Sequence, residues 1–279
     1  MTGELQKVCH RMREAYHQGS ALVLLFDYDG TLTPIVEHPC LAKLDHNTIQ
    51  ILRNLAARPR VHLGVLSGRD LDQLKSLVPV PNIYFAGTAG LEIELRGLRL
   101  VHPDAHRMAT LIRRLAVQME NEVAVYKGVW IEKKTFGLTL HYRQMQENQL
   151  ESLKSTLTQI LLAFAGELRI VPGPKAWEIT PANSWNKGTA VRLILADSGA
   201  SSDILFYAGD GANDREAMME VEAMGGITLG LGPDAPRGTL GRLPNQLGLL
   251  AFLSHLRREL EASRGPTLQP ADMQYGVVR

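Results

Sequence analysis

Short apolar runs recur along this chain and alternate with segments of helical periodicity. Four of the runs lead directly into polar or charged residues, and they span 21–26, 61–66, 82–87 and 203–210. Continuous apolar strands that alternate with helices are typical of a parallel sheet covered on both faces. The sequence therefore predicts a doubly wound, Rossmann-like α/β core, in which ligands bind beyond the carboxyl ends of the strands.

The order of predicted helices and strands changes between residues 102 and 180. A helical pattern is followed by strand-like segments at 123–134 and 136–143, and the order helix, strand, strand then repeats. This pattern predicts a small α+β cap domain of residues 102–180, inserted into a discontinuous core. The core would comprise residues 1–101 and 181–262, and the aperiodic residues 263–279 would form a flexible tail.

The composition limits the partners and the compartment of the protein. Thirty basic and 29 acidic residues give a net charge of +1, which indicates neither a nucleic-acid nor a membrane partner. Two cysteines are too few for a disulfide framework, and no apolar run approaches the roughly 20 residues of a membrane span. The first 20 residues lack the apolar core of a signal peptide. We expect a cytoplasmic monomer or small homo-oligomer that acts on a small molecule.

Two carboxylates follow the first apolar run. Asp27 and Asp29 are two residues apart, so their side chains point to the same side in extended geometry. Like charges this close repel each other, and a divalent cation or a shared proton can offset the repulsion. A strand-ending turn, where Asp and Gly are common, explains a lone pair of this kind equally well. The residues that follow the other predicted strands distinguish between these two interpretations.

The other strand ends and one helix start also carry polar groups. Ser67 follows the second run, Lys187 begins a helical segment, and Asp210 and Asp214 flank a glycine-containing turn after the last run. Each has an ordinary explanation alone, as a loop serine, a solvated lysine or a turn. Together they supply oxygen ligands for a hard cation, for which Mg²⁺ fits best, beside donors for a phosphate. Phosphoryl transfer requires this combination.

These segments resemble a known superfamily. FDYDGTL, LSGR, NKG and GDGAND are similar, in their order, to the four motifs of the haloacid dehalogenase (HAD) superfamily of phosphohydrolases. DYDGTLTPI with Pro39 and Ala42, GTAGLEIE, HYR and WEITPANSWNKG further resemble trehalose-6-phosphate phosphatases. The resemblance extends over residues 20–255, and it implies a HAD-type core with a cap and hydrolysis of trehalose 6-phosphate.

Two positions depart from the family pattern. Ala89 stands where the family usually has His, and Gly211 stands in a GDGAND segment where the family usually has an acid-rich GDD-x-TDE. The second form is closer to phosphatases of other sugar phosphates, such as sucrose phosphate or glucosyl- and mannosylglycerate phosphates. These substrates are therefore the alternative. A non-catalytic sugar-phosphate sensor is a further alternative, but it predicts a damaged acid pair, and Asp27 and Asp29 are both present.

The resemblance also implies roles for individual residues. Asp27 would attack phosphorus to form an aspartyl-phosphate, and Asp29 would protonate the leaving sugar oxygen and then deprotonate water. Mg²⁺ would be held by the Asp27 carboxylate, the Asp29 backbone carbonyl and Asp210, with Asp214 as a ligand or an outer support. The candidate phosphate-binding residues are Gly30, Thr31, Ser67, Gly68, Lys187 and Asn213.

Charged residues in the inserted segment are candidates for sugar binding. Glu132 and Lys134 are two apart on an expected strand, and Glu178 lies on another, which matches an E-x-K pair and a later Glu that bind sugar hydroxyls in the family. Three solvated charges on a sheet face are the alternative. His141 is expected to be structural. Weaker sugar-binding candidates are Arg69, Arg143 and Gly87.

Overall fold

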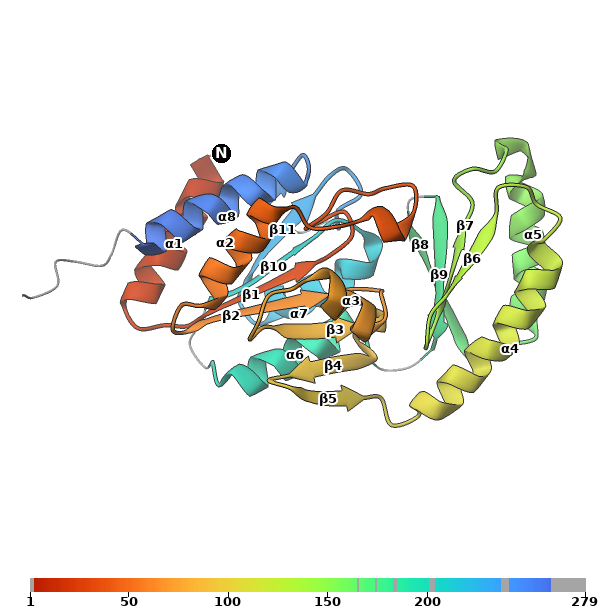
Figure 1. Ribbon diagram of the computed structural model, residues 1–279, viewed down its shortest axis with the longest axis horizontal. Helices are drawn as coiled ribbons and strands as arrows, with labels where there is room; N and C mark the ends of the chain where they lie inside the picture. The colour runs from red at the N-terminus through yellow and green to blue at the C-terminus, as the bar shows by residue number, and fades with distance from the viewer. Residues whose placement is uncertain are drawn as a thin grey trace, which may run out of the picture.

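The computed structural model describes residues 3–164, 166–173, 175–182, 185–200, 204–236 and 241–261. Within these residues the strands form two sheets (Figure 1). The larger has eight strands in the order β12-β11-β10-β1-β2-β3-β4-β5, and the smaller has four in the order β6-β7-β9-β8. This arrangement confirms the predicted fold class, an α/β core with an α+β cap. The expected tail at 263–279 lies outside the described residues.

The centre of the large sheet is parallel. Strand β1 pairs with β10 on one side and with β2 on the other, and β3, β11 and β12 extend the parallel order. All residues of β1 are buried, because helices cover both faces of the sheet. The parallel strands are β1 (Leu22–Asp27), β2 (Val61–Leu66), β3 (Tyr84–Gly87), β10 (Ile204–Gly209), β11 (Ile227–Leu231) and β12 (Gly241–Leu243).

An antiparallel hairpin at one edge of this sheet was not predicted. Strands β4 (Glu92–Leu95) and β5 (Leu98–Val101) pair with each other, and β4 also pairs with β3. Arg96 and Gly97 connect them, both with positive φ of 46° and 88°. Such a turn favours Asn-Gly or Asp-Gly, so Arg96 conceals the usual sequence signal.

Helices cover both faces of the core. Helices α1, α2, α3 and α8 pack on one face, and α6 and α7 on the other. Helix α6 ends at Gly199, which adopts the left-handed conformation that favours glycine after a helix. The core helices are α1 (Gly3–His17), α2 (His46–Ala56), α3 (Leu71–Leu77), α6 (Lys187–Ser198), α7 (Arg215–Ala223) and α8 (Gln246–Glu261), with short 3₁₀ turns η1 (Pro39–Leu41), η2 (Thr88–Gly90) and η4 (Ala212–Asp214).

The cap is an antiparallel sheet with two helices on its outer face (Figure 1). The strand predicted at 123–134 is shorter than expected, because α4 continues to Val123 and the chain then turns through Gly128 at φ 83°. None of the helices in the described part of the chain is long and apolar enough to cross a membrane. The cap elements are α4 (Ala105–Val123), β6 (Trp130–Lys133), β7 (Leu138–His141), η3 (Glu147–Gln149), α5 (Leu150–Leu162), β8 (Leu168–Gly173) and β9 (Ala176–Pro181).

The packing of α8 on the sheet gives a stability prediction. Phe252 is fully buried and stacks on Phe206 with ring centroids 5.5 Å apart, so Phe252→Ala leaves a cavity. We expect the free energy of unfolding to fall by about 3–5 kcal/mol in urea denaturation. Leu247 lies on the same helix and is 65% exposed, so Leu247→Ala should change the free energy of unfolding by less than about 0.5 kcal/mol. Similar losses in both variants would contradict this packing.

Candidate active site

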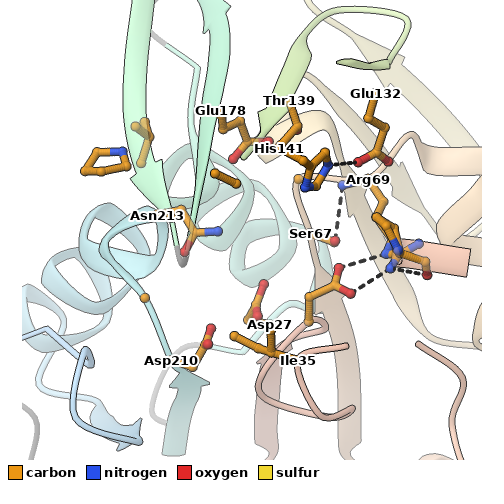
Figure 2. Close-up of a pocket in the computed structure, with 18 of the residues that line it drawn as sticks. Asp27, Ile35, Ser67, Arg69, Glu132, Thr139, His141, Glu178, Asp210 and Asn213 are labelled. Carbon is orange, nitrogen blue, oxygen red and sulfur yellow. Dashed lines mark hydrogen bonds and ion pairs between the residues drawn. The ribbon is translucent and has the colours of Figure 1, made fainter. Parts of the chain in front are cut away.

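A cavity of about 520 Å³ lies between the carboxyl ends of the core strands and the cap sheet (Figure 2). Its volume is within the range of small-molecule sites. The core contributes one wall and the cap the other, so the structure brings together candidates that are far apart in the sequence. The predicted site residues that line the cavity are Asp27, Asp29, Ser67, Gly68, Arg69, Glu132, Lys134, Arg143, Glu178, Asp210 and Asn213.

A buried lysine joins two carboxylates beneath this cavity. The Nζ of Lys187 lies 2.6 Å from Asp27 Oδ1 and 2.6 Å from Asp214 Oδ1, and all three side chains are buried. Burial opposes the charge on Lys187, but Asp214 and Asp27 outweigh it and raise the pKa of the lysine above its usual value. Lys187 is therefore an ammonium whose position is fixed by both acids. Its side chain is held at the start of α6, where Asn186 caps the helix.

Asp214 is already engaged by donors on both of its oxygens. Oδ1 also accepts a hydrogen bond from the Tyr207 hydroxyl at 2.7 Å, and Oδ2 accepts from the backbone amides of Asp210 and Gly211 at 3.0 and 3.1 Å. Four donors leave this carboxylate little capacity to bind a cation directly. The geometry favours Asp214 as a support for Lys187 and for the loop that carries Asp210.

The acidic residues fit a divalent cation. Asp27, Asp210 and Asp214 each offer an oxygen within 4.8 Å of the others. Burial and the charge of Asp214 raise the pKa of Asp27, and the same two causes raise that of Asp210 to about 7. A hard cation with oxygen ligands would offset both the burial and the repulsion.

Asp29 pairs with an arginine that follows the next strand. Arg69 donates from Nε to Asp29 Oδ2 and from Nη2 to Oδ1, both at 2.7 Å, and Nη2 also donates to the Pro39 carbonyl at 2.8 Å (Figure 2). Sequence reasoning treated Arg69 as a weak sugar-binding candidate and missed this pair. The two residues are 40 positions apart, and only the parallel register of β1 and β2 brings their loops together.

The cap wall of the cavity carries a row of polar side chains. Glu132, Thr139 and Glu178 are direct neighbours across β6, β7 and β9. Lys134 Nζ donates to Glu178 Oε1 at 3.0 Å, and both side chains are largely buried. Burial opposes the charge of Lys134, but the carboxylates of Glu178 and Glu132 together outweigh it and raise the pKa of the lysine. These residues are therefore not the solvated surface charges of the alternative interpretation.

His141, which the sequence predicts to be structural, lines this wall as well. Its Nε2 lies 2.9 Å from Glu132 Oε2, and its ring stacks on Trp130 with centroids 4.0 Å apart. Trp130 also stacks on His38 of the core, at 5.2 Å. Alternation along β7 was the available signal, because His141 and Thr139 are two residues apart on one strand.

Other predicted residues lie below or beside the cavity. Thr31 is fully buried, and an added Cβ on Gly30 would lie 2.0 Å from Asp210 Oδ2, so Gly30 makes room for that carboxylate. Gly87 does not line the cavity; an added Cβ there would lie 2.5 Å from the Leu71 amide. Gly87 therefore allows β3 to pack against the start of α3.

The loop that contains Ala89 braces the segment from Ser67 to Arg69. The Ala89 amide donates to the Ser67 carbonyl at 2.9 Å, and the Thr88 amide donates to the Arg69 carbonyl at 2.7 Å. Thr88 and Ala89 have φ of 45° and 53°, which is uncommon for residues with a side chain. This departure from the family pattern thus lies in a loop that supports the site from behind.

Comparison with known proteins identifies the family of the chain. The family model for trehalose-phosphatase matches residues 25–230. The chain belongs to the trehalose-phosphatase family.

Curated relatives and a solved structure extend the comparison. The trehalose-phosphate phosphatase of Mycobacterium tuberculosis is 30% identical over 244 residues, which cover 85% of this chain and 61% of that protein. Trehalose-phosphate phosphatase B of Arabidopsis thaliana is 28% identical over 220 residues, 75% of this chain and 58% of that protein. The chain thus spans about three-fifths of the length of these relatives. The C-terminal domain of Candida albicans trehalose-6-phosphate phosphatase shares the fold, with a TM-score of 0.78, 21% identity and coverage of 90% of this chain and 96% of that one.

Gly30 provides a test of the cation site. Because a Cβ at Gly30 would collide with Asp210, we expect Gly30→Ala to weaken divalent-cation binding at least about tenfold in calorimetric titration, a loss of about 1.4 kcal/mol. Gly19 is the matched control. It also has positive φ, 100°, but nothing lies within 4 Å of an added Cβ, so Gly19→Ala should leave divalent-cation affinity unchanged. Unchanged affinity in Gly30→Ala would contradict a cation site at Asp210.

Proposed function

We propose that this protein is a cytoplasmic, Mg²⁺-dependent phosphatase that hydrolyses trehalose 6-phosphate to trehalose and phosphate. The observation that carries the proposal is the state of Asp27. One oxygen, Oδ1, is held by Lys187, while Oδ2 has no partner at the floor of the cavity. A carboxylate fixed at one oxygen and free at the other is suited to nucleophilic attack. The family to which the chain belongs supports the same chemistry.

The reaction has two steps. In the first, Asp27 Oδ2 attacks phosphorus, the bond from phosphorus to the sugar oxygen breaks, and Asp29 gives its proton to that oxygen. In the second, Asp29 takes a proton from water as the water oxygen attacks the aspartyl-phosphate, which releases phosphate and restores Asp27. Ser67 and Asn213 line the cavity near these carboxylates and would bind the phosphoryl oxygens together with the Lys187 ammonium.

The acidic residues beneath the cavity would hold the cation. Asp27, Asp210 and the Asp29 carbonyl are the proposed Mg²⁺ ligands, and Asp214 supports them through Lys187 and the amide of Asp210. When bound, Mg²⁺ neutralises negative charge on the phosphoryl oxygens.

The cap wall would bind the sugar. Glu132, Lys134 and Glu178 form buried hydrogen-bonding groups that face the core across the cavity, and sugar hydroxyls can both donate to and accept from them. A second candidate keeps the chemistry and changes the sugar. Gly211, which lines the cavity in place of the acid usual in the family, favours that possibility. Sucrose phosphate and glucosyl- and mannosylglycerate phosphates are its substrates.

A substrate panel tests the proposal. Phosphate release is measured with Mg²⁺ for trehalose 6-phosphate, sucrose phosphate and the two glycerate compounds. We expect the highest kcat/KM for trehalose 6-phosphate. A higher value for another compound would reassign the substrate, and binding of a sugar phosphate without phosphate release would support the non-catalytic sensor.

Asp27→Asn should abolish turnover and leave the fold intact. The amide cannot attack phosphorus, and it removes one of the buried acids that burial and Asp214 disfavour as anions, so thermal stability should equal or exceed that of wild type. Asp72→Asn, at a largely exposed position, is the control and should retain activity. Single-turnover hydrolysis by Asp27→Asn at the wild-type rate would exclude Asp27 as the nucleophile.

Glu178→Gln and Lys134→Ala should lower kcat/KM for trehalose 6-phosphate about ten- to hundredfold, because each loses a charged hydrogen bond. Both should leave hydrolysis of 4-nitrophenyl phosphate within about threefold of wild type, since that substrate has no sugar hydroxyls.

The control for this pair of variants is the neighbouring lysine. Lys133 is half exposed and pairs with Glu120 outside the cavity, so Lys133→Ala should hydrolyse both substrates normally. Equal losses on both substrates in Glu178→Gln would mean that Glu178 supports the fold or the phosphate site. No loss on either substrate would mean that this residue does not bind the sugar.

A further inference from the structure

Arg69 is fixed in place by both its backbone and its side chain. Its amide donates to Ser67 Oγ at 3.2 Å, and its carbonyl accepts from the Thr88 amide at 2.7 Å. The guanidinium makes two bonds to Asp29 and one to the Pro39 carbonyl, and Arg69 is only 3% exposed. The guanidinium also lies over the Tyr28 ring, 5.3 Å from its centroid. Few side chains in the site have so little freedom.

Asp29 has no comparable support of its own. It lies in the turn after β1, and its side chain is 42% exposed, so an unpaired carboxylate here would sample several rotamers. The two-bonded fork of an arginine fixes both the position and the plane of a carboxylate, which a lysine cannot do. The two 2.7 Å bonds therefore define where the Asp29 oxygens lie relative to Asp27.

This placement matters for a poor leaving group. A sugar alkoxide leaves phosphorus readily only if a proton reaches its oxygen as the bond breaks, and the donor must be aligned with that oxygen. The Arg69 fork holds Asp29 on the cavity wall beside Asp27, and Ser67 ties the same arginine to the proposed phosphate site.

We propose that Arg69 is a positioning residue, which orients Asp29 for proton transfer to the leaving sugar oxygen. The proposal deepens the phosphatase function proposed above and rests on it. In the first step the proton passes from Asp29 to the sugar oxygen while the bond from that oxygen to phosphorus breaks and Asp27 bonds to phosphorus. The carboxylate that remains on Asp29 keeps its two bonds to Arg69, so it is oriented to accept a proton from water in the second step.

The alternative is direct contact between Arg69 and the sugar, because Arg69 also lines the cavity. Direct contact predicts a higher KM and an effect that is independent of Asp29. A positioning role predicts a lower kcat, a KM within about threefold of wild type, and an effect that disappears when Asp29 is replaced.

A double-mutant cycle separates the two. Arg69→Gln, Asp29→Asn and the double variant are assayed on trehalose 6-phosphate in single-turnover experiments with Mg²⁺. We expect Arg69→Gln to lower the single-turnover rate about ten- to a hundredfold in the wild-type background. In the Asp29→Asn background, the same substitution should lower the rate by less than about twofold. Arg69→Lys, which keeps the charge without the fork, should lose at least about tenfold. Arg107→Gln, which removes an exposed ion pair with Glu167 outside the cavity lining, should match wild type.

A substrate that needs no protonated leaving group gives a second measurement. In rapid-quench experiments with 4-nitrophenyl phosphate, the first turnover should release nitrophenolate in Arg69→Gln within about threefold of the wild-type rate. This measurement does not depend on Asp29→Asn, so it remains informative even if Asp29→Asn has no measurable turnover on the sugar phosphate. If Arg69→Gln does not fold, as judged by thermal unfolding with Mg²⁺, Arg69→Lys is used in both measurements.

The outcomes are distinct. Losses that multiply in the double variant, or an equal loss of the first turnover with 4-nitrophenyl phosphate, would overturn the positioning role. Wild-type protein that releases no phosphate from any sugar phosphate would instead overturn the proposed function.

Discussion

The ammonium of Lys187, held between two buried carboxylates, is the interaction on which the rest of the site depends. Asp27 at the end of β1 and Asp214 after β10 cannot both remain charged in the interior without a counterion. Lys187 reaches them as the first residue of α6, a helix that packs on one face of the sheet. Its bond to Asp27 uses one oxygen and leaves the other, Oδ2, without a hydrogen-bond partner in a residue that lines the cavity.

From this centre the site divides into two chemically different halves. The core half concentrates carboxylates, a lysine and loop amides, which suit a cation and a phosphoryl group. The cap half offers Glu132, Lys134 and Glu178 with largely satisfied hydrogen bonds, which suit the hydroxyls of a sugar. Arg69 stands between the halves. Its side chain binds Asp29, the proposed general acid, and its amide binds Ser67 in the proposed phosphate site. Arg69 therefore lies where the phosphate and the sugar of a bound substrate would meet.

The sequence predicted the parts of the fold that local patterns determine. Continuous apolar runs predicted β1, β2 and β10. Polar residues at their ends predicted a candidate site, because carboxyl ends of parallel strands meet at one edge, and the structure places many of these residues around one cavity. It did not reveal the β4–β5 hairpin, whose turn carries Arg96 in place of Asn or Asp. Nor did it reveal the pairing of Arg69 with Asp29 or the place of His141 in the cavity wall. Both features depend on tertiary contacts between loops and strands that are distant in the sequence.

The claim that Asp27 presents a free oxygen to phosphorus can be tested by trapping the intermediate. Wild-type protein is mixed with trehalose 6-phosphate and Mg²⁺, quenched in acid within the first turnover, digested and mapped by mass spectrometry. The account predicts a phosphoryl group on the peptide that contains residues 22–33, located on Asp27 and removed by hydroxylamine. A phosphoryl group on another residue, or phosphate release in the first turnover with no labelled peptide at any quench time, would contradict it.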